Sequence, residues 1–75
     1  MAIFELKSKD GAISLIVRAK CLSCARQVAV ESTPSNELML WRDPSLSTVN
    51  VIYNPERQGF EPKGKRAIIR RTEHE

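Results

Sequence analysis

Residues 3 to 18 read IFELKSKDGAISLIVR, and this stretch decides the fold. Apolar and polar side chains alternate in both of its halves, which is typical of half-buried strands. Asp10-Gly11 lies between the halves and is a pair that two-residue type I′ turns prefer. The stretch therefore predicts an antiparallel hairpin over residues 2–19.

A turn centred on Asp10-Gly11 also predicts the register of this hairpin. Leu6 then faces Leu15, and Phe4 faces Val17, so that these side chains share one face. A half-buried sheet requires such a shared apolar face, because a slip of one residue would turn every side chain over. The alternative is a looser turn from Ser8 to Gly11 with a slipped register.

Residues 21 to 32 predict a helix that follows the hairpin. Its apolar side chains recur at the spacing of one helical face: Cys24, Ala25, Val28 and Ala29. Pro34 ends it, because the residue before a proline is pushed out of the helical region. About three turns are too few to be stable alone, so the helix must pack on the sheet.

Residues 37 to 54 predict a second hairpin with its turn at residues 43–46. Leu38 and Leu40 alternate with Met39 and Trp41, and apolar residues alternate again after the turn. Asp-Pro at the start of the turn favours a β-turn, because Asp bonds to the backbone and Pro pre-sets φ. Trp41 is expected in the core rather than as an exposed stacking platform.

The last third predicts a loop, one more strand and a tail within a single domain, residues 1–75. Pro and Gly punctuate residues 54–66, which we expect to be a mobile loop. Residues 67–71 predict the final strand, and the polar residues 72–75 predict a frayed tail. The order β-β-α-β-β-β indicates an α+β fold, a small antiparallel sheet of two hairpins plus a C-terminal strand, with one helix packed on a face.

The charge of the chain is concentrated near its C-terminus. Six of the twelve basic residues lie between residues 57 and 71, where Glu61 is the only acid, whereas basic and acidic residues balance before residue 57. A local positive field attracts a polyanion or an acidic protein surface. The candidate partner-binding residues are Lys63, Lys65, Arg66, Arg70, Arg71, Arg57 and Arg42. A solvated face without a partner is the plainer interpretation.

Cys21 and Cys24 form a Cys-x-x-Cys motif where a strand passes into the predicted helix. Such a position lowers the pKa of the first thiol in thioredoxin-like redox motifs. The same spacing supplies half of a tetrahedral zinc site, but His74 is the only further nitrogen or sulfur ligand of the usual kind. A structural role, with Cys24 buried on the helix and Cys21 near its cap, is the third alternative.

No catalytic constellation stands out, and the sequence predicts a protein that is not an enzyme and needs no cofactor. The only histidine, His74, lies in the polar tail, where it cannot be held as a general base. The three glycines are far apart, so no phosphate-binding loop is formed. The two cysteines, the charged N-terminal residues and the lack of a long apolar run predict the reducing cytoplasm and no membrane partner.

Three segments resemble small uncharacterised bacteriophage and mobile-element proteins. These are LIVRAK at residues 15–20, ARQVA at residues 25–29 and WRDPSLS at residues 41–47, so the resemblance covers residues 13 to 48. It implies context alone, since it transfers no catalytic residue. Short phage proteins often bind host machinery such as RNA polymerase, nucleases and replication factors.

The sequence as a whole therefore predicts a small binding protein of phage or mobile-element type. Its basic C-terminal surface would contact nucleic-acid machinery, with an acidic protein surface as the first expectation for the partner and a regulatory effect on processes such as transcription. Direct non-specific binding of nucleic acid is the second hypothesis, with Trp41, Tyr53 or Phe60 available for stacking if exposed. A zinc or redox protein built on Cys21 and Cys24 is the third. Either a monomer or a weak homodimer would fit.

Overall fold

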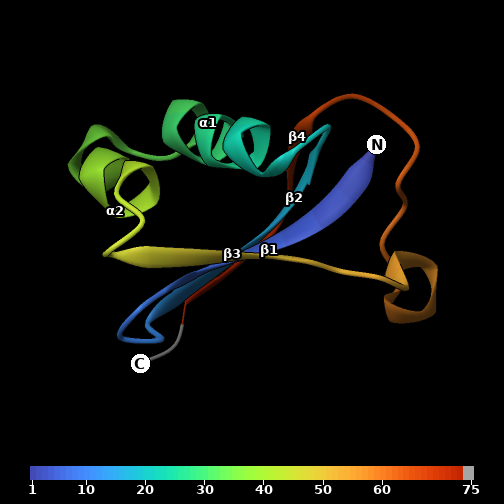
Figure 1. Ribbon diagram of the computed structural model, residues 1–75, viewed down its shortest axis with the longest axis horizontal. Helices are drawn as coiled ribbons and strands as arrows, with labels where there is room; N and C mark the ends of the chain where they lie inside the picture. The colour runs from blue at the N-terminus through green and yellow to red at the C-terminus, as the bar shows by residue number, and fades with distance from the viewer. Residues whose placement is uncertain (74–75) are drawn as a thin grey trace.

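The computed structural model describes residues 1–73 as an antiparallel sheet with helices on one face (Figure 1). The strands run in the order β3-β1-β2-β4, and every neighbouring pair is antiparallel. The elements in chain order are β1 (Ala2–Ser8), β2 (Ile13–Ala19), α1 (Leu22–Ser32), η1 (Ser35–Glu37), α2 (Leu38–Arg42), β3 (Ser47–Val51), η2 (Pro55–Gln58) and β4 (Ala67–Glu73). The predicted α+β class, with a helix on one face of a small antiparallel sheet, is confirmed.

The central hairpin has the predicted register but a different turn. Phe4 pairs with Val17, and Leu6 pairs with Leu15. The strands are joined by a looser turn, in which the Gly11 amide donates to the Ser8 carbonyl at 2.9 Å. Within residues 1–73 only glycines have positive φ, so Asp10 does not adopt a type I′ conformation. The alternative with a looser turn is thus correct for the turn, although the register does not slip.

The core lies between the sheet and the helical layer (Figure 1). From the hairpin, Leu6, Leu15 and Val17 are fully buried in it. From α1, which occupies the predicted helical range, Ala25, Val28 and Ala29 are buried against them. The small side chains of α1 allow this short helix to lie close to the sheet, and the packing stabilises it.

The predicted second hairpin is wrong in its first half, where residues 38–42 form helix α2 instead of a strand. Trp41 is fully buried, whereas Met39 is 56% exposed, so this segment has one buried face. The Trp41 indole N–H donates to the Glu37 carboxylate at 3.2 Å, a contact between residues four apart that helical geometry permits. Four of these five residues are strong helix formers, yet the run also satisfies an alternating pattern, and tertiary packing decides between helix and strand.

The predicted turn at residues 43–46 is present, but it joins α2 to β3. The Leu46 amide donates to the Asp43 carbonyl at 3.0 Å, and the Ser45 amide donates to the Asp43 carboxylate at 2.8 Å. The second half of the predicted hairpin is correct, because β3 forms there and pairs with β1. Trp41, as predicted, belongs to the core.

Residues 52–66 connect the two edges of the sheet, since β3 and β4 lie at opposite edges (Figure 1). The short helix η2 forms within this connection, and the Met1 ammonium donates to the Pro62 carbonyl at 3.1 Å. The predicted mobility of residues 54–66 stays a prediction. The predicted last strand is confirmed as β4, which is longer than expected because it also includes Thr72 and Glu73. These two residues are therefore not part of a frayed tail, and residues 74–75 lie outside the described part.

Candidate functional site

Strand pairing brings the end of β2 beside the start of β4. Arg18 of β2 pairs with Ala67 of β4, and the two strands run in opposite directions. Lys20 therefore leaves the sheet at the same end at which Lys65 and Arg66 enter it. Residues 45 positions apart in the chain thus approach one another, and this proximity is produced by the sheet topology rather than by a local motif.

Arg18 holds the loop that precedes β4 against this end of the sheet. Its guanidinium Nη1 donates to the Lys63 carbonyl at 2.8 Å. Gly64 has a φ of +124°, and a Cβ atom at this position would collide with the Arg18 guanidinium. The glycine is needed here because only it tolerates both the backbone conformation and the close approach. The loop backbone therefore passes directly against Arg18.

We call the four cations at this position the basic end: Lys20, Lys63, Lys65 and Arg66. All four residues are exposed. Among residues 1–73 the three lysines make no salt bridge, and Arg66 lies 3.6 Å from Glu31 with both side chains about half exposed, at 52% and 49%. Ion pairs this exposed are weak in water, so Arg66 remains available to an external anion.

Arg71, one of the predicted binding residues, is engaged by internal acids instead. Its guanidinium donates to both carboxylate oxygens of Glu37, at 2.9 and 2.7 Å, and to Glu73 at 2.9 Å. These hydrogen bonds hold the pKa of Glu37 below its ordinary value, and those to Glu37 and then Glu73 raise the pKa of Arg71. Arg71 thus ties the edge strand β4 to the start of α2, and we assign it a structural role.

We expect Arg71→Ala to lower the free energy of unfolding by about 1–2 kcal/mol at pH 7, because the bidentate pair with Glu37 is partly buried. Because folding lowers the pKa of Glu37, its carboxylate stabilises the folded protein at pH values above the ordinary pKa near 4.5. This contribution is lost as the pH falls through the pKa that Glu37 has in the folded state. The difference in unfolding free energy between the wild type and Arg71→Ala should therefore become smaller below about pH 4.5. Urea denaturation from pH 7 to pH 3 measures this difference.

Arg70→Ala is the matched control for this test. Arg70 pairs with Ile16 and Arg71 with Leu15, so the two arginines project to opposite faces of the sheet. Arg70 makes no salt bridge within the described residues, and its removal should change the unfolding free energy by less than about 0.5 kcal/mol. Equal losses in both variants would contradict the structural role of the Arg71–Glu37 pair.

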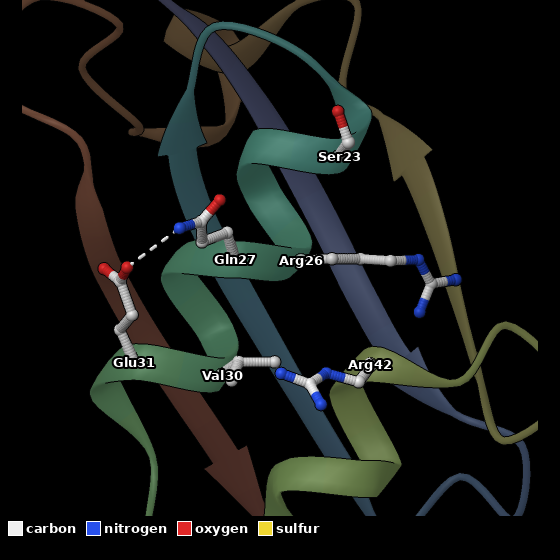
Figure 2. Close-up of a pocket in the computed structure, with 6 residues that line it drawn as sticks. All are labelled: Ser23, Arg26, Gln27, Val30, Glu31 and Arg42. Atoms are coloured by element: carbon white, nitrogen blue, oxygen red, sulfur yellow. Dashed lines mark hydrogen bonds between the residues drawn. The ribbon is translucent and has the colours of Figure 1, made fainter.

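The remaining two predicted residues lie away from the basic end. Arg57 belongs to η2, on the β3 side of the molecule, beside Glu56. Arg42 ends α2, towards the other end of the sheet, and lines an open hollow of about 460 Å³ beside α1 (Figure 2). Neither residue joins the four cations of the basic end.

The hollow beside Arg42 has the character of a solvated helix face. Figure 2 shows Gln27 bonded to Glu31 along α1, at 3.1 Å, while Arg26 points away towards β3. Arg26 has its own partners there, the Trp41 carbonyl and Ser47. The hollow therefore offers one arginine and one carboxylate across an open surface, which is too little to define a ligand.

Cys21 and Cys24 lie at the start of α1, where Cys21 is the N-cap residue. The Cys24 amide donates to the Cys21 sulfur at 3.3 Å, and the two Sγ atoms are 2.8 Å apart. Hydrogen bonds from the Cys24 thiol, the Ser23 hydroxyl and the Cys24 amide lower the pKa of Cys21 to about 7. The hydrogen bond to Cys21, followed by partial burial, raises the pKa of Cys24.

Among the residues that the structure describes, these two thiols have no further metal ligands nearby. Within residues 1–73, no group of three or more histidine, cysteine, aspartate or glutamate side chains is placed to hold a metal ion. His74, the remaining candidate ligand, lies outside the described residues. A zinc site would therefore need ligands from elsewhere, for example from a second copy of the chain.

Sequence patterns gave no signal for Lys20 in the basic end, for Arg18 beside it, or for Glu37 as the partner of Arg71. Arg18 and Lys20 lie in the charge-balanced part of the chain, and only the pairing of β2 with β4 makes them neighbours of the last third. The alternating pattern assigns Glu37 to a strand, in which its side chain would not meet that of Trp41. A helix predicted at residues 38–42 would have indicated this contact, because residues four apart, here Glu37 and Trp41, lie on one face of a helix.

Comparison of the chain with protein-family models, with curated proteins and with solved structures finds no match. The described residues contain no helix with the length and apolar character needed to cross a bilayer.

Proposed function

We propose that this protein is a small binding protein that docks on an acidic protein surface through its basic end. The observation that carries the proposal is the gathering of Lys20, Lys63 and Lys65 beside Arg66, with no salt bridge to the lysines among residues 1–73. Exposed cations on one side of a small domain steer an acidic partner into contact, and they raise the association rate more than they lengthen the lifetime of the complex.

An acidic protein is favoured over direct binding of nucleic acid by the position of the aromatic side chains. Trp41 is fully buried and is not available to stack on bases. Tyr53 is 85% exposed, but it follows β3, at the sheet edge opposite to β4. Phe60 lies three positions before Lys63 but is half-buried. The basic end therefore has charge without a fully exposed aromatic side chain beside it, and non-specific single-strand binding usually combines the two.

The resemblance of residues 13–48 to small phage and mobile-element proteins suggests the kind of partner. Proteins of that class often act on host nucleic-acid machinery in the cytoplasm, such as RNA polymerase or a nuclease, and the partner would have to present an acidic surface to the basic end. In this proposal the chain modulates such a partner without catalysing a reaction of its own.

The test is a double charge reversal, Lys63→Glu with Lys65→Glu, in a pull-down from host lysate treated with nuclease. We expect the wild type to retain a protein partner after nuclease treatment and the variant to lose it. With the isolated partner, the association rate of the variant should fall by about tenfold or more at low salt. The matched control is Lys7→Glu with Lys9→Glu, which makes the same change in charge at the hairpin end of β1 and should bind as the wild type does.

Two results would count against this function. Capture that survives the reversal of Lys63 and Lys65 would show that the basic end is merely solvated. Loss of all capture on nuclease treatment, together with duplex DNA binding that weakens with salt at a log–log slope near −0.9 per phosphate, would favour nucleic acid as the partner instead.

A further inference from the structure

The two thiols at the start of α1 differ in exposure and in surroundings. Cys21 is exposed, whereas Cys24 is half-buried and packs against the core. Their sulfur atoms approach to 2.8 Å, within hydrogen-bonding reach of one another. One sulfur can therefore be reached from solvent, and the other is positioned to attack it from the protein side.

We propose that Cys21 and Cys24 form a thiol–disulfide exchange site whose substrate is a small, negatively charged disulfide of the glutathione type. Cys21 is the attacking residue and Cys24 is the resolving residue. The exchange takes place on the two sulfur atoms and does not depend on the proposed docking function, although its substrate preference draws on Lys20 and Arg66 of the basic end.

The local structure favours the thiolate of Cys21. Cys21 caps a helix, and the partial positive charge at a helix N-terminus stabilises an anion there. The first turn of α1 contains no acidic residue that would oppose this effect. With its pKa lowered to about 7, about half of Cys21 is ionised at neutral pH, while the raised pKa of Cys24 keeps that thiol protonated. A thiol with a pKa near the ambient pH is the most effective attacking group.

The exchange balances as a transfer of two electrons from the dithiol to the disulfide RS–SR. The Cys21 thiolate attacks one substrate sulfur, the S–S bond breaks, and the first RS⁻ leaves and takes up a proton. Cys24 then loses its proton and attacks the Cys21 sulfur, which releases the second RS⁻. The products are two RSH molecules and a Cys21–Cys24 disulfide, so the protein is oxidised and the substrate is reduced.

The preference for a negatively charged substrate follows from the neighbouring side chains. Lys20 precedes Cys21 in the chain, and Arg66 lies close enough to Cys24 to favour its ionised form. Cations beside the attacking sulfur attract a substrate with carboxylates and stabilise the departing thiolate. Cys21 is exposed, so a small disulfide can reach its sulfur without a conformational change.

The test begins with the reduced protein and oxidised glutathione, followed by intact-mass spectrometry. The wild type should lose two hydrogens and end as the internal disulfide. Cys24→Ser should stop at a stable adduct with one glutathione on Cys21, and Cys21→Ser should react at least about tenfold more slowly, since its remaining thiol is mostly protonated. Alkylation rates at pH 7 compare the two thiols one at a time. Cys21, the thiol that remains in Cys24→Ser, should be alkylated faster than Cys24, the thiol that remains in Cys21→Ser.

The Cys21→Ser variant separates a chemical role of the thiol from a structural one. Ser is a strong N-cap residue, so Cys21→Ser should keep the helix cap and the unfolding free energy while it loses the exchange reaction. Equal reaction of the two single variants would overturn the assignment of roles. Retention of zinc by the reduced wild type, with both thiols protected from glutathione, would overturn the exchange site itself.

Lys20→Glu tests the class of substrate. It should slow the reaction with oxidised glutathione several-fold more than the reaction with the uncharged bis(2-hydroxyethyl) disulfide, because the second rate changes only through the thiolate and not through attraction of the substrate. Salt should reduce the first rate in the wild type and have little effect on the second. A Lys20→Glu variant that reacts with both disulfides as the wild type does would overturn the preference for a negatively charged substrate.

Discussion

Trp41→Ala is expected to lower the free energy of unfolding by about 3–5 kcal/mol, the usual loss for a buried tryptophan. Trp41 is fully buried between the helical layer and the sheet, and it is the largest such side chain in the described core. A domain of this size has a stability near the lower end of the usual range of about 5–15 kcal/mol, so the loss is most of the total. We therefore expect a large unfolded population at 25 °C.

Urea denaturation followed by far-ultraviolet circular dichroism measures this loss without depending on tryptophan fluorescence. Met39→Ala is the control, because Met39 belongs to the same helix but is 56% exposed. It should cost less than about 0.5 kcal/mol. Trp41→Phe should lie between the two, since it keeps an aromatic ring in the core but removes the hydrogen bond to Glu37. A Trp41→Ala protein as stable as Met39→Ala would contradict the central position of the indole.

Arg26→Ala is expected to have the second largest effect, a loss of about 2–4 kcal/mol, because it leaves several buried polar groups without a donor. The Arg26 guanidinium donates to the Trp41 carbonyl at 3.0 Å, to the Ser47 hydroxyl at 2.9 Å and to the Ser47 carbonyl at 2.9 Å. Ser47 is fully buried, so water cannot replace the lost bonds without opening the structure. Arg26 thus joins α1, α2 and β3 through one side chain.

Urea denaturation monitored by Trp41 fluorescence measures this effect. Arg26→Lys should recover only part of the loss, because one ammonium group cannot reproduce the planar fork that reaches all three acceptors. Gln27→Ala is the control from the neighbouring position of α1, since the Gln27 side chain bonds only to Glu31 on the exposed face. Equal midpoints for Arg26→Ala and Gln27→Ala would contradict the proposed role of Arg26.

The candidate sites differ in how much of them could be predicted from sequence. The position of Cys21 and Cys24 at a helix start was predictable from the motif and the helix boundary, but the 2.8 Å approach of the two sulfurs and their unequal exposure were not. The excess of basic residues in the last third was also visible in sequence. Which of them are available to a partner was not visible, because Arg71 meets Glu37 across 34 positions of the chain.

Local patterns were sufficient wherever the chain pairs with or packs against its own near neighbours. The register of the β1–β2 hairpin, the helix α1 and the β-turn at residues 43–46 all follow from alternation, helical spacing and turn residues within short windows. Tertiary structure decided the helical form of residues 38–42, because alternation favours a strand and residue propensity favours a helix in this short window, and burial of Trp41 with its bond to Glu37 selects the helix. It also decided the composition of the basic end, since hydrogen bonding between β2 and β4 joins segments whose proximity no local pattern encodes.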